Sequence, residues 1–139
     1  ADVVVRIPGD NPCVEYNAVD AAIDEYLRVP YSFYSNTTAQ VGSVAVDGIG
    51  AEVCSYSRLQ WLDQRTRGYP AWREHPHQYF VDQGMLQLTT ATVRLDVNTQ
   101  ADYEFVSDIY DHLYPTNPAF TPEDILSYLT QKEALCRAT

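Results

Sequence analysis

Asp10 is the acidic side chain that the sequence places best for chemistry. It lies in a G-D-N-P turn directly after an apolar, β-branched segment over residues 2–7. Such a segment predicts a strand, and open α/β sheets bind ligands just beyond the carboxyl ends of their strands. A carboxylate at that point can serve as a ligand for a divalent cation. The alternative is a plain turn in which Asp10 caps its own backbone.

Arg6 lies inside the same apolar segment. A buried guanidinium group requires a carboxylate or phosphate partner, because an unpaired charge is costly to remove from water. If the segment forms an edge strand, Arg6 can face water instead. The sequence leaves both arrangements open.

The sequence contains no clear motif for a zinc site or for a catalytic nucleophile. His75 and His77 form an H-x-H pair, but no third zinc ligand is evident, which favours a polar helix start. The three cysteines, Cys13, Cys54 and Cys136, form no C-x-x-C pair, so neither a zinc site nor a disulfide framework is indicated. The sequence also lacks G-x-S-x-G and Walker-type motifs.

The composition limits the classes of molecule that this chain is expected to bind. The chain has 139 residues, which predicts a single α/β domain over 1–139. Its net charge is −10, and its one lysine is Lys132. A negative charge of this size repels the phosphate backbone of nucleic acid, and the sequence has no cluster of Lys and Arg residues that could bind it. No apolar run is long enough to span a membrane, and no signal peptide is recognisable at the start. We therefore expect a cytoplasmic protein, with reduced cysteines.

Alternating strands and helices must position these residues. The segment 2–7 predicts a strand covered on both faces, and residues 17–28 carry one apolar helical stripe. Predicted strands follow at 31–34 and 51–55, and residues 85–97 predict two strands or one bent strand. Residues 36–50 predict a loop or hairpin. Predicted helices cover 57–65, 71–82 with a break or a late start at Pro76, and the segments after the caps Thr99 and Thr121. This order predicts an α/β fold with a mixed, mostly parallel sheet flanked by helices.

Several segments, taken in order, resemble one family. The stretches are V-V-V-R-I-P-G-D-N-P (3–12), G-A-E-V-C-S (50–55), R-E-H (73–75), V-R-L-D-V-N-T-Q-A-D-Y-E (93–104) and I-Y-D-H-L-Y-P-T-N-P-A-F-T-P-E-D-I-L (109–126). Together they resemble the cytidylyltransferases, or CMP-sugar synthetases, and within them the spore-coat polysaccharide cytidylyltransferase-like subgroup. The matches extend over nearly the whole chain.

The resemblance implies a doubly wound α/β sheet of the nucleotide-diphospho-sugar transferase kind. It also implies transfer of CMP from CTP to an acidic sugar or a similar surface-polysaccharide precursor, with Mg²⁺ as cofactor and a homodimer as assembly. The family's Gly-, Arg- and Lys-rich loop for the triphosphate has no counterpart here. Because the chain also begins without Met, we expect it to be the C-terminal portion of such an enzyme, inactive when isolated.

The resemblance assigns Asp10 to the metal. Asn98 stands where the family has a second metal-binding Asp, and this departure weakens the expected second ligand. Asp96 lies two residues earlier on the same strand face and can compensate. The alternative for Asn98 is a plain turn residue before the cap at Thr99.

On the acceptor side, the resemblance points to Glu52 and to the R-E-H stretch of Arg73, Glu74 and His75. It also suggests a structural or nucleotide-side partner for Arg6. Glu52 has an alternative as the outward-facing residue of an alternating strand.

Two other hypotheses remain at this stage. The chain can be a non-catalytic remnant that recognises the acceptor or forms the dimer, with residues 36–50 belonging to a dimer arm. It can also be an independent small α/β domain, which a first strand at a sheet edge and a large separation of Asp10 from Asn98 would favour.

Overall fold

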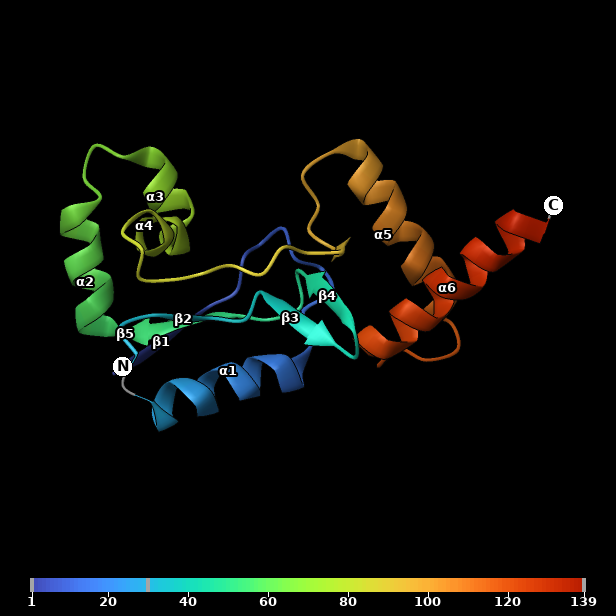
Figure 1. The fold of residues 1–139 in the computed structure, drawn as a ribbon, viewed down its shortest axis with the longest axis horizontal. Helices are drawn as coiled ribbons and strands as arrows, with labels where there is room; N and C mark the ends of the chain where they lie inside the picture. Colours follow the sequence, from blue (N-terminus) through green and yellow to red (C-terminus); the bar gives the residue numbers. More distant parts are fainter. Residues whose placement is uncertain (1, 30, 139) are drawn as a thin grey trace.

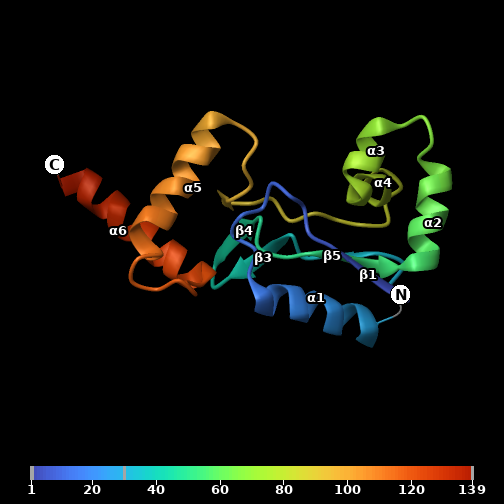
Figure 2. The same ribbon diagram turned by 180° about the vertical axis from the view of Figure 1, so that it is seen from behind.

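The computed structural model describes residues 2–29 and 31–138. These residues form a mixed α/β structure with two three-stranded sheets and six helices. The sheets lie near the middle, with α1 along one side, α2, α3 and α4 at one end and α5 and α6 at the other (Figures 1 and 2). The helices are α1 (Tyr16–Arg28), α2 (Tyr56–Arg65), α3 (Pro70–Glu74), α4 (Pro76–Asp82), α5 (Gln100–Leu113) and α6 (Pro122–Ala138).

The first sheet has the order β1-β5-β2 and is antiparallel throughout. Its strands are β1 (Val3–Arg6), β5 (Glu52–Ser55) and β2 (Tyr34–Ser35). β5 is central, and its residues 52–54 are buried. β1 is an edge strand with three partly buried residues and an exposed Val5, so the expectation of a strand covered on both faces is wrong. The register places Arg6 directly opposite Glu52.

The second sheet has the order β3-β4-β6. β3 (Thr38–Val41) and β4 (Val44–Asp47) form an antiparallel hairpin, and β4 pairs in parallel with the short β6 (Val93–Arg94). The hairpin turn contains Gly42 with a φ of 60°, a conformation that glycine adopts without steric cost. Of the loop or hairpin expected within residues 36–50, the structure therefore shows the hairpin.

The expectation of a single, mostly parallel sheet is wrong for the described strands. Three of the four strand pairings are antiparallel. The physical reason lies in the connections: a two-residue turn between β3 and β4 permits only antiparallel pairing, whereas a parallel pair needs a crossover. The coarser expectation of an α/β structure holds.

The predicted strand over 85–97 is also largely absent. Only Val93–Arg94 is a strand, and the residues before it form an extended connection from α4 to the second sheet (Figure 1). Met85 and Leu88 are exposed in this connection. A strand is stable only beside a partner, and β4 offers its edge to residues 93 and 94 alone.

The helices begin largely where their caps predict. Thr99 and Asp102 form the capping box of α5, and Thr121 and Asp124 exchange the equivalent hydrogen bonds at α6. The predicted helix over 71–82 divides at Pro76 into α3 and α4, as expected. The cap of α2 is Ser55 and not the expected Ser57.

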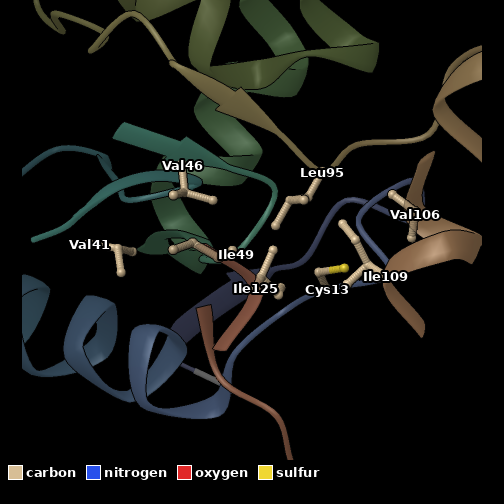
Figure 3. Packing of buried hydrophobic residues seen from close by; sticks show 8 residues of the cluster. All are labelled: Cys13, Val41, Val46, Ile49, Leu95, Val106, Ile109 and Ile125. Carbon is tan, nitrogen blue, oxygen red and sulfur yellow. The ribbon is translucent and has the colours of Figure 1, made fainter. Parts of the chain in front are cut away.

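The largest buried cluster joins the hairpin to the C-terminal helices. Val41 and Val46 of the hairpin, Leu95, and Ile109 and Ile125 of the helices are buried together (Figure 3). A second cluster around Phe33 and Phe80 packs α2 and α4 on the first sheet, and a third one fixes α1. Within the described ranges, no helix is long and apolar enough to cross a membrane.

Candidate functional site

A polar cleft of about 740 Å³ opens between the α3–α4 corner, the turn after β1 and the segment after β6. Its walls come from six separate stretches of sequence, so only folding assembles it. Of the eight candidate site residues selected from the sequence, the cleft brings together seven: Arg6, Asp10, Glu52, Glu74, His75, Asp96 and Asn98.

The turn after β1 and the segment after β6 meet directly. The backbone N–H of Val97 donates to the carbonyl oxygen of Asp10 at 2.8 Å. This bond fixes Asp10 beside the stretch that carries Asp96 and Asn98, and all three line the cleft. The first strand does lie at a sheet edge, but the separation of Asp10 from Asn98 that an independent domain would require is not found.

Asp96 is the more constrained of the two carboxylates. It is 9% exposed, and Arg94 donates to both of its oxygens, from Nε at 3.0 Å and from a terminal nitrogen at 2.5 Å. The side-chain amide of Asn98 donates to Asp96 Oδ2 at 2.6 Å. The hydrogen bonds from Arg94 hold the pKa of Asp96 below its ordinary value. Asp96 is therefore an anion with part of its lone-pair capacity already used.

The side chain of Asp10, unlike that of Asp96, has no partner among the described residues. Its side chain forms no hydrogen bond or ion pair with the part of the chain that the structure describes, although its backbone does. The alternative in which this carboxylate caps its own turn is therefore not observed. The oxygens of Asp10 are available to a ligand in the cleft.

These donors fit a magnesium ion better than a transition metal. The described residues contain no cluster of three or more His, Cys, Asp and Glu side chains arranged to hold a metal. Mg²⁺ does not need such a cage, because it is usually bound by one or two carboxylates together with water and substrate phosphates. Asp10 and the remaining oxygen capacity of Asp96 and Asn98 match that requirement. Zinc on His75 and His77, whose ring centroids are 5.9 Å apart, lacks a third ligand in this region.

Glu52 forms the buried floor of the cleft. Its side chain is 1% exposed, and Arg6 donates to its Oε2 at 2.7 Å. Its Oε1 lies 2.6 Å from Nδ1 of His77. The alternative of an outward-facing Glu52 is thus wrong, because β5 is the central strand and α4 covers this position. Arg6 does have the carboxylate partner that its place in an apolar strand required, although its side chain remains 36% exposed.

Glu74 and His75 lie at the rim. The carbonyl oxygen of Glu74 accepts a hydrogen bond from Arg6 at 2.8 Å, so its backbone is fixed. Both side chains are more than half exposed, with His75 Nε2 4.0 Å from a carboxylate oxygen of Glu74. They can contact a ligand that enters the cleft, but nothing fixes their orientation tightly.

Arg73 is the one selected residue that the structure does not bring to the cleft. Its guanidinium group pairs with the carboxylate of Asp63 in α2 at 2.6 Å, and this contact ties α3 to α2. Since α3 turns its successive residues through about 100° each, the residue before Glu74 faces the neighbouring helix instead. Its role in this structure is a surface ion pair.

His77, Arg94 and Asp47 also line the cleft, and we did not select them from the sequence as acceptor-site residues. His77 appeared only as half of an H-x-H pair. The pairing of His77 with Glu52 spans 25 residues, and no local pattern indicates it. For Arg94, its place two residues before Asp96 was an available signal, because alternate residues of an extended chain share a face.

Comparison of the chain with protein-family models, curated proteins and solved structures gave no match. The functional argument therefore rests on the cleft itself. Its chemistry is that of a site for a polar, charged ligand: free carboxylate oxygens at Asp10, guanidinium groups at Arg6 and Arg94, and imidazoles at His75 and His77. Such a mixture can hydrogen-bond a hydroxyl-rich molecule, and carboxylates outnumber guanidinium groups among the lining residues.

Proposed function

We propose that this chain is the acceptor-side portion of a cytidylyltransferase, which transfers CMP from CTP to an acidic sugar or a similar surface-polysaccharide precursor and releases pyrophosphate. The observation that carries the proposal is the meeting of two distant turns in one polar cleft. The Asp10 turn and the 96–98 segment are joined by the bond from Val97 N–H to the Asp10 carbonyl. The family resemblance requires these two stretches to converge, and generic strand and helix order does not.

Asp10, Asp96 and the amide oxygen of Asn98 are the groups that would hold Mg²⁺. When bound, this ion would neutralise charge on the nucleotide phosphates. The protein's own contribution is placement: the Val97–Asp10 bond fixes the backbone that carries one carboxylate, and Arg94 fixes the other carboxylate directly. The finer fold, a doubly wound sheet completed by an upstream segment with the triphosphate loop, belongs to the same proposal.

An unused donor on Arg94 supports an acidic acceptor. Arg94 uses Nε and one terminal nitrogen on Asp96, and its side chain is 66% exposed, so its other terminal nitrogen can donate to a ligand carboxylate. His75 at the rim offers a second donor. Hydroxyl groups of a sugar can bond to Glu74, Asn11 and Gln78 on the same walls.

The second candidate is a remnant that recognises the acceptor without catalysis. A specific observation favours it: Asn98 replaces the family's Asp, and Arg94 places a positive charge directly on Asp96, where a cation would compete. The dimer-arm role for residues 36–50 receives no such support. Val41, Ala45, Val46 and Ile49 of this stretch are buried in the chain's own core.

The test uses the protein expressed with its native upstream region. Pyrophosphate release is measured with CTP, Mg²⁺ and a panel of acidic sugars. We expect turnover with at least one sugar, and Asp10→Asn should lower it on the order of 100-fold. Asp20→Asn, an exposed position on α1, is the matched control and should leave turnover unchanged.

Two outcomes separate the candidates. No turnover with any sugar or nucleotide, from a protein that remains folded, would reject the transferase in favour of the remnant. In that case, binding of an acidic sugar, measured by calorimetry, should persist and should weaken in Arg94→Gln.

A further inference from the structure

The pair formed by His77 and Glu52 is not part of the family resemblance, yet it is the most deeply fixed polar arrangement in the cleft. Building on the proposed function, we propose that His77 Nε2 is the base that accepts the proton of the attacking acceptor hydroxyl, and that Glu52 is its positioning residue. Four features carry this inference: burial, hydrogen-bond direction, access and surroundings.

Burial makes Glu52 a fixed reference point. Its side chain is 1% exposed, and each oxygen has a charged or polar partner, Arg6 on Oε2 and His77 on Oε1. Burying a carboxylate is costly unless hydrogen-bond donors replace the water molecules that it loses. Arg6 supplies one such donor, at 2.7 Å, and holds the carboxylate in place. The other oxygen therefore has a defined direction towards α4.

Hydrogen-bond direction then sets the form of the imidazole. A carboxylate paired with a guanidinium group has only acceptor oxygens, so the contact of 2.6 Å requires the proton on His77 Nδ1. In the neutral ring, the second nitrogen, Nε2, is left with a free lone pair. An acid residue that orients a histidine in this way is how many enzymes prepare a general base.

Access places Nε2 in the cleft. The two nitrogens lie on different edges of the ring, and Nδ1 faces the buried Glu52. His77 is 24% exposed and lines the cleft, and Nε2 has no hydrogen bond to any residue that the structure describes. A hydroxyl group of a molecule in the cleft can therefore donate to it.

The other charged groups around His77 come from every wall of the cleft. They are Arg6, Asp10 and Asp47 from the sheets and the turn after β1, Glu74 and His75 from the α3–α4 corner, and Arg94 and Asp96 from the segment at β6. The acidic groups stabilise an imidazolium once it forms. His75, at 5.9 Å between ring centroids, is the nearest competitor as a base, but it lacks a buried carboxylate partner.

The step balances as an ordinary substitution at phosphorus. The acceptor O–H bond breaks, its proton goes to His77 Nε2, and the oxygen forms a bond to the α-phosphorus of CTP. The bond from that phosphorus to the bridging oxygen breaks, and pyrophosphate leaves with the electron pair. Glu52 balances the positive charge on the ring, which later releases its proton to water.

The first measurement needs no turnover. Long-range ¹H–¹⁵N spectra of this chain report which nitrogen of His77 carries the proton. We expect the Nδ1–H form in the neutral ring and a mixture of both forms in Glu52→Gln. An Nε2–H form in the unaltered protein would overturn the inference, because Nε2 could not then accept a proton.

The second measurement uses the protein with its native upstream region. We expect His77→Gln to lower kcat on the order of 100-fold with little change in KM, and to remove the fall of kcat on the acid side of the pH profile. Glu52→Gln should lower kcat less, and Glu52→Asp should restore part of it. His112→Gln, remote from the cleft and stacked on Tyr128, is the control.

Failure of this inference is distinguishable from failure of the proposed function. If the unaltered protein shows no turnover, the proposed function fails, whatever His77 does. If it turns over and a folded His77→Gln or His77→Asn retains the kcat and pH profile of the unaltered protein, the base assignment fails alone. Circular dichroism confirms that each variant is folded.

Discussion

At Glu52, the central strand turns a carboxylate inwards, and the cost of burying its charge is offset by two partners. Asp10, by contrast, is partly exposed and has no side-chain partner among the described residues. One acid is thus held for structure and orientation, while the other is left available for a ligand. A binding site needs both kinds of acid: one that is fixed and holds the neighbouring side chains in place, and one that is free to contact the ligand.

Removal of the guanidinium group at Arg6 tests the structural side of this division. Arg6→Gln leaves Glu52 buried with His77 as its remaining partner, and an unsatisfied buried acceptor is costly. We expect the free energy of unfolding to fall by about 2 kcal/mol in urea titrations. Arg28→Gln is the matched control, because its ion pair with Glu25 is exposed and should contribute less than about 0.5 kcal/mol. Equal losses in both variants would contradict a special role for the buried pair.

Asp96 makes a prediction about pH. Its folded pKa is lowered, first by the hydrogen bonds from Arg94, so the carboxylate stabilises the folded state fully above its unfolded pKa of about 4. That contribution is lost as the pH falls through the folded pKa. Asp96→Asn should therefore be less stable than the unaltered protein at pH 7, by about 1 kcal/mol because Arg94 is largely exposed.

The measurement is urea unfolding at a series of pH values from 7 downwards. The difference between the two proteins should shrink as the solution becomes acidic. A constant difference at all pH values would mean that the carboxylate charge does not stabilise the fold.

At the scale of elements, residues near in sequence determine where the helices begin, whereas they do not determine where the strands form. Thr99 and Asp102 exchange hydrogen bonds at the start of α5, and these bonds use only residues within four positions of one another. The segment 85–92 contains β-branched and apolar residues as well, but forms a connection. A helix satisfies its own backbone, whereas a strand depends on a neighbour that the local sequence does not name.

The capping box gives a prediction at this scale. Thr99→Ala removes the side chain that accepts from the Asp102 N–H at 3.3 Å, and we expect a loss of about 1 kcal/mol in the free energy of unfolding. Thr130→Ala, at an exposed position of α6, is the control, because its hydroxyl bonds back to Leu126 within the helix, and alanine favours helices. A loss in Thr130→Ala as large as that in Thr99→Ala would argue against the cap as the cause.

At the scale of the whole molecule, one cluster connects the cleft to the core. Leu95, which is 0% exposed, lies between Arg94 and Asp96 and packs with the hairpin and α5 (Figure 3). Gly48 of the loop after β4 approaches it so closely that a Cβ atom there would lie 3.1 Å from the Leu95 carbonyl carbon. The residue that fills the core thus also sets where Asp96 emerges.

Leu95→Ala should therefore affect both stability and the site. Truncation of a fully buried leucine is expected to cost about 3 kcal/mol, measured by urea unfolding. Leu88→Ala, at a residue 48% exposed in the connection after α4, is the control and should cost far less. If Leu95→Ala were as stable as Leu88→Ala, the cluster would not be the core that the packing indicates.

The sequence by itself determined the features that depend on near neighbours. These are the helix starts at Thr99 and Thr121, the interruption of the helical pattern at Pro76 and the presence of mixed α/β structure. It also selected seven residues that share the cleft, because the resemblance connected stretches that physical patterns could not connect. The function inferred from that resemblance stays a prediction.

Only the tertiary structure decided which strands pair, which acids are buried and which histidine contacts Glu52. Arg73 and Glu74 are adjacent in sequence, yet one pairs with α2 and the other reaches the cleft rim. Glu52 meets His77 across 25 residues and Arg6 across 46. Contacts of this kind follow from the packing of whole elements, whose relative placement depends on the summed burial of many apolar side chains and not on any local pattern.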